Sequence, residues 1–296
     1  MKTVSRDKLV RWRWEDPDLA YTVARRRLRR SRMAQDGKLV ILAMDHPGRG
    51  VTEAGGHPWA MADRLEVLDR LMAALAVPEV DGVLATPDVM EELLVYNALR
   101  VAAGEADVLD HRVLVGSINR AGLAQSVFER NDFMSSYTPS ALVDFQLDAG
   151  KILVHLDLQH SETFSTLKMA TDALNQLITY RLPVFLEVLP VPGNDSNQLV
   201  KAVGVATALG MSSWGRWLKL PMVEQFERVA RATTCPIVLL GGGRSGGLDA
   251  LTDNIRRCLS AGTNVRGVMI GRGLLFPDDG TDSVRAVQAI AHMVHA

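Results

Sequence analysis

The stretch VDGVLATPDVMEELLVYNALR (80–100) contains the unit that recurs along the whole chain. Its first part, 80–86, is a short apolar run that ends in small or polar residues. The second part, 87–100, has apolar residues at helical spacing and charged residues on the opposite face. The unit therefore predicts a strand that is followed at once by an amphipathic helix.

Eight apolar runs of this kind occur among the 296 residues, and amphipathic segments such as 59–76 and 222–233 lie between them. Near-continuous apolar runs with many β-branched residues are typical of parallel strands that are covered on both faces. Eight strand–helix alternations in one chain predict an α/β fold. They favour a single closed (β/α)8 TIM barrel over an open sheet. We expect the strands at 38–45, 80–86, 111–117, 151–157, 183–188, 215–220, 236–241 and 265–271.

The first 35 residues lie outside this repeat. The segment ARRRLRRSRM (24–33) carries six arginines in a run that is compatible with a helix. A nucleic-acid-binding arm is one interpretation, but the formal net charge is −1, so the rest of the chain balances the arginines. We expect an arginine-rich helical extension at 1–35, acting as a cap or as a contact in a homo-oligomer, and a catalytic barrel at 36–296.

Composition predicts a cytoplasmic protein without nucleic-acid or membrane partners. No run of 18 apolar residues and no signal peptide is present, and the net charge creates no field that would attract an anionic surface. The two cysteines, Cys235 and Cys258, lack metal-type spacing, and we expect buried, reduced thiols.

Polar residues collect at the carboxyl ends of the expected strands, which is where TIM barrels place their catalytic groups. His155 and Asp157 face the same side of their strand because alternate residues share a face. The other candidates at these ends are Asp45, His46, Ser117, Asn119, Glu187 and Lys219.

Lys219 lies among apolar residues of the sixth strand, where a cation is expected only if it faces a polar lumen. Burial lowers the pKa of a lysine, and the free amine attacks carbonyl groups. The alternative is a lysine that reaches the surface from a frayed strand end. Glu187, inside PVFLEVLP (183–190), is either paired with a cation of the next strand or acts as a general acid/base.

The last two strands end in glycines. The stretch GGGRSGG (241–247) follows the seventh strand, and IGRG (270–273) follows the eighth. TIM barrels commonly build phosphate sites here from backbone N–H groups and a short helix. We expect phosphate to be bound by Gly241, Gly242, Gly243, Arg244, Gly271 and Arg272, with Ser117 and Asn119 contacting the substrate.

The segments LAMDH (42–46), FLEVLP (185–190), WLKLP (217–221), PIVLLGGG (236–243) and GVMIGRGLLF (267–276) resemble class I aldolases of the deoxyribose-phosphate, tagatose-bisphosphate and archaeal-type fructose-bisphosphate kind. By this resemblance Lys219 matches the Schiff-base lysine and Asp45 matches the acid that ends the first strand. The archaeal-type enzymes carry a tyrosine on the fifth strand, where this chain has Leu189, whereas Glu187 resembles the glutamate of the tagatose-bisphosphate branch.

The overall pattern is most similar to bacterial aldolase-like barrels associated with myo-inositol catabolism. This likeness implies a lyase that needs no cofactor and cleaves 2-deoxy-5-keto-gluconate 6-phosphate to dihydroxyacetone phosphate and malonate semialdehyde. In that enzyme Lys219 forms the imine, Glu187 transfers the proton, and Asp45, His46, His155 and Asp157 assist. A tagatose- or fructose-bisphosphate-type substrate and a sulfosugar phosphate are the alternatives.

Other functions fit parts of the same pattern. Transaldol or acyl transfer could use the same lysine with a second, acceptor substrate. A metal-dependent lyase could use His46, His155 and Asp157, or the i, i+3 pair of Asp157 and His160, but we expect no metal. A barrel without catalysis that acts through its arginine-rich arm is the remaining alternative.

Overall fold

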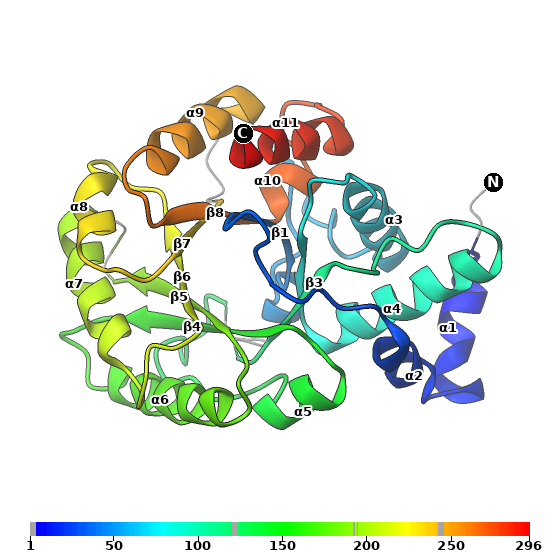
Figure 1. The fold of residues 1–296 in the computed structure, drawn as a ribbon, viewed down its shortest axis with the longest axis horizontal. Helices are drawn as coiled ribbons and strands as arrows, with labels where there is room; N and C mark the ends of the chain where they lie inside the picture. Colours follow the sequence, from blue (N-terminus) through cyan, green and yellow to red (C-terminus); the bar gives the residue numbers. More distant parts are fainter. Residues whose placement is uncertain (1–3, 120–123, 192, 194, 242–245) are drawn as a thin grey trace.

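The computed structural model describes residues 4–119, 124–191, 193, 195–241 and 246–296, and its core is one closed barrel of eight parallel strands in chain order (Figure 1). The strands are β1 (Leu39–Met44), β2 (Gly82–Ala85), β3 (Val113–Ser117), β4 (Ala149–Leu156), β5 (Val184–Pro190), β6 (Arg216–Pro221), β7 (Ile237–Leu240) and β8 (Val265–Ile270). The predicted (β/α)8 barrel is confirmed, and the strands differ from prediction only at their ends.

Helices cover the outside of the barrel (Figure 1). They are α3 (Arg64–Leu75), α4 (Pro87–Ala102), α5 (Pro139–Asp144), α6 (Thr163–Thr179), α7 (Ser196–Ala208), α8 (Phe226–Arg231), α9 (Gly247–Leu259), α10 (Arg272–Leu275) and α11 (Ser283–His295), with a 3-10 turn η1 (Pro47–Arg49) after β1. None of the helices in the described ranges is both long and apolar enough to cross a membrane. Cys258 is buried and Cys235 is half-buried, and both thiols are free.

The lumen begins with a layer of apolar side chains. Alternate residues of a strand point to opposite faces, so one set faces the helices and the other faces the barrel axis. The inward set includes Ala43, Ala149 and Phe185, with Trp217 packed against them. Met33 and Ala34, from the segment that precedes β1, pack against the same cluster and close the amino-terminal end of the lumen.

The N-terminal segment folds as two short helices, α1 (Arg6–Glu15) and α2 (Leu19–Arg26), which lie against α4 (Figure 1). Within the arginine-rich run at 24–33, the helix ends at Arg26, and Arg27 has an extended backbone conformation. The guanidinium groups of this run are used for contacts that a helix would not allow. Arg27 binds Asp148 at 2.8 Å and two backbone carbonyls that precede β3 and β4.

This extended segment crosses the amino-terminal face of the barrel (Figure 1). Arg29 also binds Asp148, at 2.8 Å, and Arg30 binds Asp81 at 2.5 Å. Asp81 and Asp148 stand just before β2 and β4 and also accept hydrogen bonds from the backbone N–H groups of neighbouring strands. These arginines therefore attach the extension to the barrel.

Candidate active site

A layer of charged side chains lies directly above the apolar layer of the lumen, toward the carboxyl ends of the strands. Asp45, Lys151, Glu187 and Lys219 each follow an inward-facing apolar residue by two positions, on β4, β5 and β6 and immediately after β1. All four are at most 4 % exposed. We refer to these four residues as the four-charge cluster.

The cluster is held together by short ion pairs. The Nζ atom of Lys151 lies 2.8 Å from Oδ2 of Asp45 and 2.8 Å from Oε2 of Glu187. The Nζ atom of Lys219 lies 2.9 Å from the same Oε2 of Glu187. Register pairs Glu187 directly with Lys219 across β5 and β6. Two cations and two anions thus alternate in one buried chain of contacts.

These contacts set the charge states of the cluster. Burial alone would raise the pKa of Glu187 and of Asp45, but Lys151 and Lys219 lower both pKa values well below their ordinary range. Burial lowers the pKa of Lys219, and this effect outweighs the opposing influence of Glu187. Lys151 also lowers the pKa of Lys219, and it contacts both carboxylates of the cluster, whereas Lys219 contacts Glu187 alone. Lys219 therefore gives up its proton more readily than an exposed lysine does.

Sequence reasoning missed Lys151. It is the first residue of the expected fourth strand, where a charged residue usually marks the solvent-exposed start. β4 begins earlier, at Ala149, so Lys151 lies inside the strand and faces inward. Its long side chain reaches up to the level of Glu187, which pairs in register with Leu153. Lys151 and His155 face the same side of the strand because an even number of positions separates them. This pattern could have identified Lys151 from the sequence.

His46 borders the cluster from the turn after β1. Its Nδ1 lies 3.8 Å from Oδ1 of Asp45. Burial, opposed by Asp45, lowers the pKa of His46 to about 4, so the imidazole is neutral at pH 7. Neither this Nδ1 nor Oδ1 of Asp45 has a hydrogen-bond partner among the described residues, although both atoms are buried. Two buried polar atoms at this edge of the cluster are thus available to hydrogen-bond a bound molecule.

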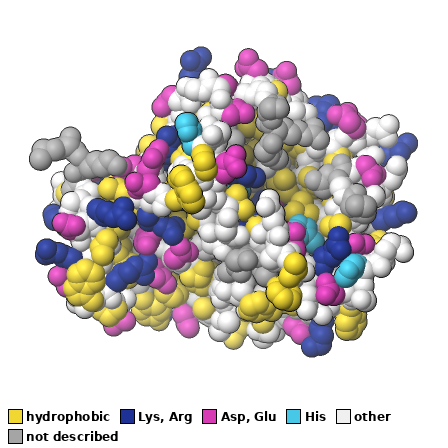
Figure 2. Space-filling view, turned by 180° about the vertical axis from the view of Figure 1, so that it is seen from behind, with side chains coloured by type: hydrophobic (Ala, Val, Ile, Leu, Met, Phe, Trp, Pro, Cys, Tyr) yellow, Lys and Arg dark blue, Asp and Glu magenta, His cyan; other side chains and the backbone are white. Residues whose placement is uncertain are grey.

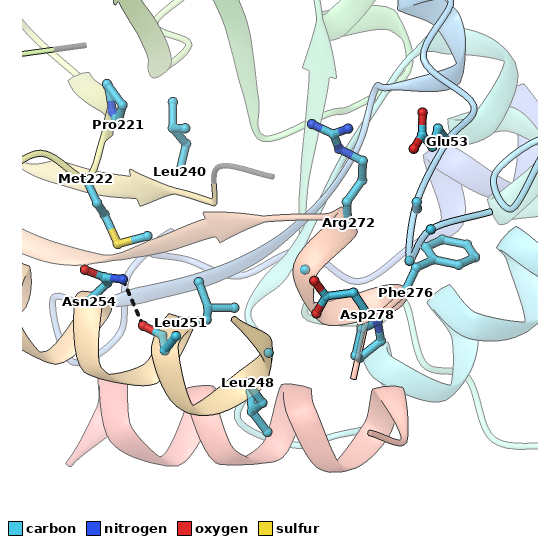
Figure 3. Close-up of a pocket in the computed structure, with 17 residues that line it drawn as sticks. Glu53, Pro221, Met222, Leu240, Leu248, Leu251, Asn254, Arg272, Phe276 and Asp278 are labelled. Carbon is cyan, nitrogen blue, oxygen red and sulfur yellow. Dashed lines mark hydrogen bonds between the residues drawn. The ribbon is translucent and has the colours of Figure 1, made fainter. Parts of the chain in front are cut away.

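A pocket of about 580 Å³ opens beside the carboxyl ends of β6, β7 and β8 (Figure 3). Apolar side chains such as Met222, Leu248 and Leu251 line one part of it. Arg272 and Glu53 lie at the other part, and the guanidinium group of Arg272 extends away from the leucines (Figure 3). The opposite side of the molecule from Figure 1 is hollowed near its centre, with Lys or Arg and His side chains nearby (Figure 2).

The predicted phosphate residues are described only in part. Gly242, Gly243 and Arg244 lie outside the described residues. A side chain at Gly241 would meet Ile270 at 2.7 Å. A side chain at Gly271 would collide with the backbone of Ala43 and with the His46 ring, so packing of β8 against β1 requires glycine there.

Ser117 and Asn119 are buried in the wall of the lumen. The Ser117 hydroxyl donates to the carbonyl of Asn119 at 3.2 Å. The Asn119 amide donates to Asp132 at 2.8 Å and to the carbonyl of Leu153 at 2.7 Å, and its oxygen accepts from the Leu153 N–H. Asn119 therefore joins the loop after β3 to β4, and these hydrogen bonds occupy its side chain.

His155 and Asp157 lie nearer the rim than the four-charge cluster. His155 Nδ1 is 3.4 Å from Glu129, and Asp157 is 3.4 Å from Arg130. His155, Glu129 and Arg130 line a second pocket, of about 350 Å³. The structure thus brings Asp45, His46, Glu187 and Lys219 together but places His155 and Asp157 in a separate group. Across the described ranges, no group of three or more His, Cys, Asp or Glu side chains is arranged to hold a metal ion.

The fold and part of the sequence are shared with known proteins. The structure superposes on the crystal structure of Cgl0159 from Corynebacterium glutamicum with a TM-score of 0.88 and 37 % identity, covering 99 % of this chain and 98 % of that one. A Schiff-base-forming fructose-1,6-bisphosphate aldolase has the same fold at 16 % identity, with a TM-score of 0.63 over 93 % of this chain and 99 % of that one. An archaeal fructose 1,6-bisphosphate aldolase has the same identity and coverage with a TM-score of 0.62, which confirms the expected likeness of fold.

A curated relative is more distant in sequence but similar in length. It is 2-amino-3,7-dideoxy-D-threo-hept-6-ulosonate synthase 1 of Archaeoglobus fulgidus, 22 % identical over 272 residues, which cover 92 % of each protein. Residues 37–291 match the family described as Cgl0159-like. With nearly the whole barrel inside that match, the chain belongs to the Cgl0159-like family.

Proposed function

We propose that this chain is a class I aldolase that cleaves a phosphorylated ketose through an imine on Lys219. The observation that carries the proposal is the contact of 2.9 Å between Lys219 and Glu187, both buried in the lumen. A buried lysine with a lowered pKa supplies the free amine that attacks a ketone, and a carboxylate beside it supplies the base. Both groups stand at the carboxyl end of the barrel, where such enzymes work.

The first half of the reaction forms the imine. The neutral amine of Lys219 adds to the ketone carbon, and the resulting carbinolamine loses water to give a positively charged iminium. The unpaired Oδ1 of Asp45 and Nδ1 of His46 lie on this side of the cluster and can take and return the protons of the departing hydroxyl. Lys151 lies between Asp45 and Glu187, 2.8 Å from each, and holds both carboxylates in place.

The second half breaks the carbon–carbon bond. Glu187 removes the proton from the hydroxyl that lies β to the iminium carbon, and the aldehyde leaves. The bonding electrons move to the iminium, which becomes a neutral enamine. The positive charge next to Glu187 disappears as the carboxylate accepts the proton. Loss of that charge raises the proton affinity of Glu187 while it acts as the base. Reprotonation of the enamine and hydrolysis release the ketone and restore Lys219.

For the substrate we propose 2-deoxy-5-keto-gluconate 6-phosphate, with dihydroxyacetone phosphate and malonate semialdehyde as products. This choice rests on the likeness to barrels associated with myo-inositol catabolism. Arg272 in the larger pocket supports a phosphorylated substrate. Tagatose- or fructose-bisphosphate-type substrates and sulfosugar phosphates use the same mechanism and belong in the same assay.

The experiment is borohydride trapping followed by peptide mass mapping. The enzyme is incubated with each of these sugar phosphates and with dihydroxyacetone phosphate, and then reduced. We expect a secondary-amine adduct on Lys219 alone, and none without substrate. An adduct on Lys151, or no adduct with any of the carbonyl compounds, would contradict the proposal.

Transfer to a second aldehyde is a further candidate, because the relative from Archaeoglobus fulgidus is named a synthase. It would use the same imine, and the enamine would attack an acceptor instead of being protonated. Cleavage measured with and without a panel of acceptor aldehydes distinguishes the two. An aldolase turns over without an acceptor, whereas a transferase remains a stable enamine until the acceptor is added.

A further inference from the structure

The second pocket, of about 350 Å³, lies at the rim of the barrel on the side of β4 and β5. We refer to it as the rim pocket. Its lining includes His155 on β4, Val191 directly after β5, and Glu129 and Arg130 from the loop after β3. The mechanism proposed above gives these residues no role.

The rim pocket continues the lumen beyond Glu187. Leu153 pairs in register with Glu187, and His155 follows Leu153 by two residues on the same face of β4. At about 3.3 Å per residue, His155 stands about 7 Å beyond the level of Glu187 along the strand. Val191, which also lines the pocket, lies four residues beyond Glu187. A molecule that is held at Lys219 and extends past Glu187 therefore enters the rim pocket.

The main chain of Arg130 is fixed by a buried group of hydrogen bonds. The hydroxyl of Thr166, on α6, donates to the carbonyl of Arg130 at 2.8 Å and accepts from the N–H of Asp132 at 3.2 Å. The carboxylate of Asp132 accepts from the amide of Asn119 at 2.8 Å. Thr166, Asp132 and Asn119 are at most 4 % exposed. The segment that carries Arg130 is thus ordered before any ligand binds, which favours affinity.

Arg130 is the permanent cation among the described residues that line the rim pocket. Within the described ranges its one ion pair, with Asp157, spans 3.4 Å. Contacts between an arginine and a carboxylate are normally about 2.7–2.9 Å long. The pair of Arg27 with Asp148 has such a length, 2.8 Å. Arg130 therefore keeps donors for a ligand anion, and a ligand anion competes only with a long contact.

The two glutamates of the lining lie beside imidazole rings of the same pocket. Oε1 of Glu129 is 3.4 Å from Nδ1 of His155, and Oε2 of Glu162 is 3.8 Å from Nδ1 of His160. A proton on either ring offsets the negative charge of its glutamate. The positive charge of Arg130 is thus the one that an entering anion meets.

We propose that Arg130, assisted by His155, binds a second acidic group of the substrate, at the end of the carbons that leave as the aldehyde. The candidate substrates share such a group: a carboxylate in 2-deoxy-5-keto-gluconate 6-phosphate, a second phosphate in a ketose bisphosphate and a sulfonate in a sulfosugar phosphate. Arg130 then selects doubly acidic substrates over ketose monophosphates. That the anion belongs to the aldehyde half rests on the proposed function, whereas the binding of an anion at Arg130 does not.

Stable alcohol analogues of the aldehyde products test the proposal without any aldolase chemistry. The probes are 3-hydroxypropionate, glycerol 3-phosphate and 2,3-dihydroxypropanesulfonate, and the uncharged control is 1,3-propanediol. Dissociation constants are measured by NMR titration at fixed ionic strength. We expect at least one acidic analogue to bind the wild type more tightly than 1,3-propanediol does, and the analogue that binds most tightly identifies the acidic group.

The variants show whether this binding depends on Arg130. Loss of one charge-assisted contact weakens binding by about 10- to 100-fold, so we expect this for Arg130→Ala and a smaller loss for Arg130→Lys. The control is Arg231→Ala, exposed on α8, and should bind like the wild type. Asp157→Asn removes the carboxylate that competes for Arg130, and we expect it to tighten the binding of the acidic analogue. Circular dichroism establishes that each variant is folded.

Two results would overturn the proposal. One is that no acidic analogue binds more tightly than 1,3-propanediol, and the other is that Arg130→Ala binds the acidic analogues like the wild type. Binding that depends on Arg130, in a protein that forms no imine with any carbonyl compound, would support this inference and reject the aldolase. An imine on Lys219 without binding that depends on Arg130 would support the aldolase and reject this inference.

Discussion

Replacement of Lys151 by methionine removes one cation from the four-charge cluster and keeps nearly the same side-chain length. By Coulomb's law, each of its two contacts of 2.8 Å contributes about 6 kcal/mol at an effective dielectric constant of about 20. The desolvation cost of the buried ammonium, several kcal/mol, offsets part of this. Breaking a buried pair while its partners stay charged lowers the free energy of unfolding by about 3–5 kcal/mol.

The same substitution changes the reactivity of Lys219. Lys151 helps to lower the pKa of Lys219, so its removal leaves two carboxylates with one ammonium and raises that pKa. A rise of one unit reduces the free amine about tenfold at any pH below the pKa. We therefore expect Lys151→Met to slow imine formation at neutral pH and to shift its pH profile toward alkaline values.

Urea unfolding and borohydride trapping across pH measure the two effects. The matched control is Lys168→Met on α6, because the Lys168 side chain is 70 % exposed in a surface pair with Asp172. The reasoning is refuted if Lys151→Met unfolds like the control and traps substrate with the wild-type pH profile. A loss of stability with an unchanged pH profile would show that Lys151 is only a structural cation.

Three further predictions follow from the same contacts. Glu187→Gln should still form the Lys219 adduct but cleave the substrate about 10²- to 10⁴-fold more slowly, as measured by adduct mass and by single turnover. Arg27→Met should lower the free energy of unfolding by about 3 kcal/mol in urea, whereas its exposed neighbour Arg26→Met should not. Because the folded-state pKa of Glu187, about 2, lies below the unfolded value of about 4.3, its stabilisation is present above pH 4.3 and is lost as pH falls toward 2. Glu187→Gln should flatten the dependence of unfolding on pH in that window, and an unchanged slope would contradict this.

The strands were predictable because each is covered on both faces and so reads as a continuous apolar run. Lys219 and Glu187 were predicted as site residues because a charged side chain within such a run avoids the apolar outer layer only by facing the lumen. The alternation of faces along the strand also predicted that His155 faces inward. Alternation does not show how far along the barrel axis a residue lies. His155 lies four residues beyond Lys151 on β4, so it stands near the rim rather than beside Lys219.

Two other features of the structure could not be predicted from the local sequence pattern. The contact of Lys151 with Asp45 joins β4 to the residue that follows β1, and only closure of the barrel brings the two together. The path of residues 27–38 depends on Asp81 and Asp148, which lie far away in sequence. Helix propensity over the arginine run was outweighed by these long-range ion pairs, since propensities differ by less than about 1 kcal/mol per residue.

In the proposed mechanism, the four-charge cluster allows carbon–carbon cleavage to occur in a dry lumen. Lys151 and the Lys219 iminium carry two positive charges, and Asp45 and Glu187 carry two negative charges, so the cluster is neutral before the bond breaks. When Glu187 takes the hydroxyl proton and the iminium becomes an enamine, one charge of each sign disappears together. The buried net charge is zero on both sides of the step, and no ion has to be resolvated. The ion pair of Asp45 with Lys151 persists through this step, so the proposed mechanism assigns the fixed cation to Lys151 and the reacting amine to Lys219.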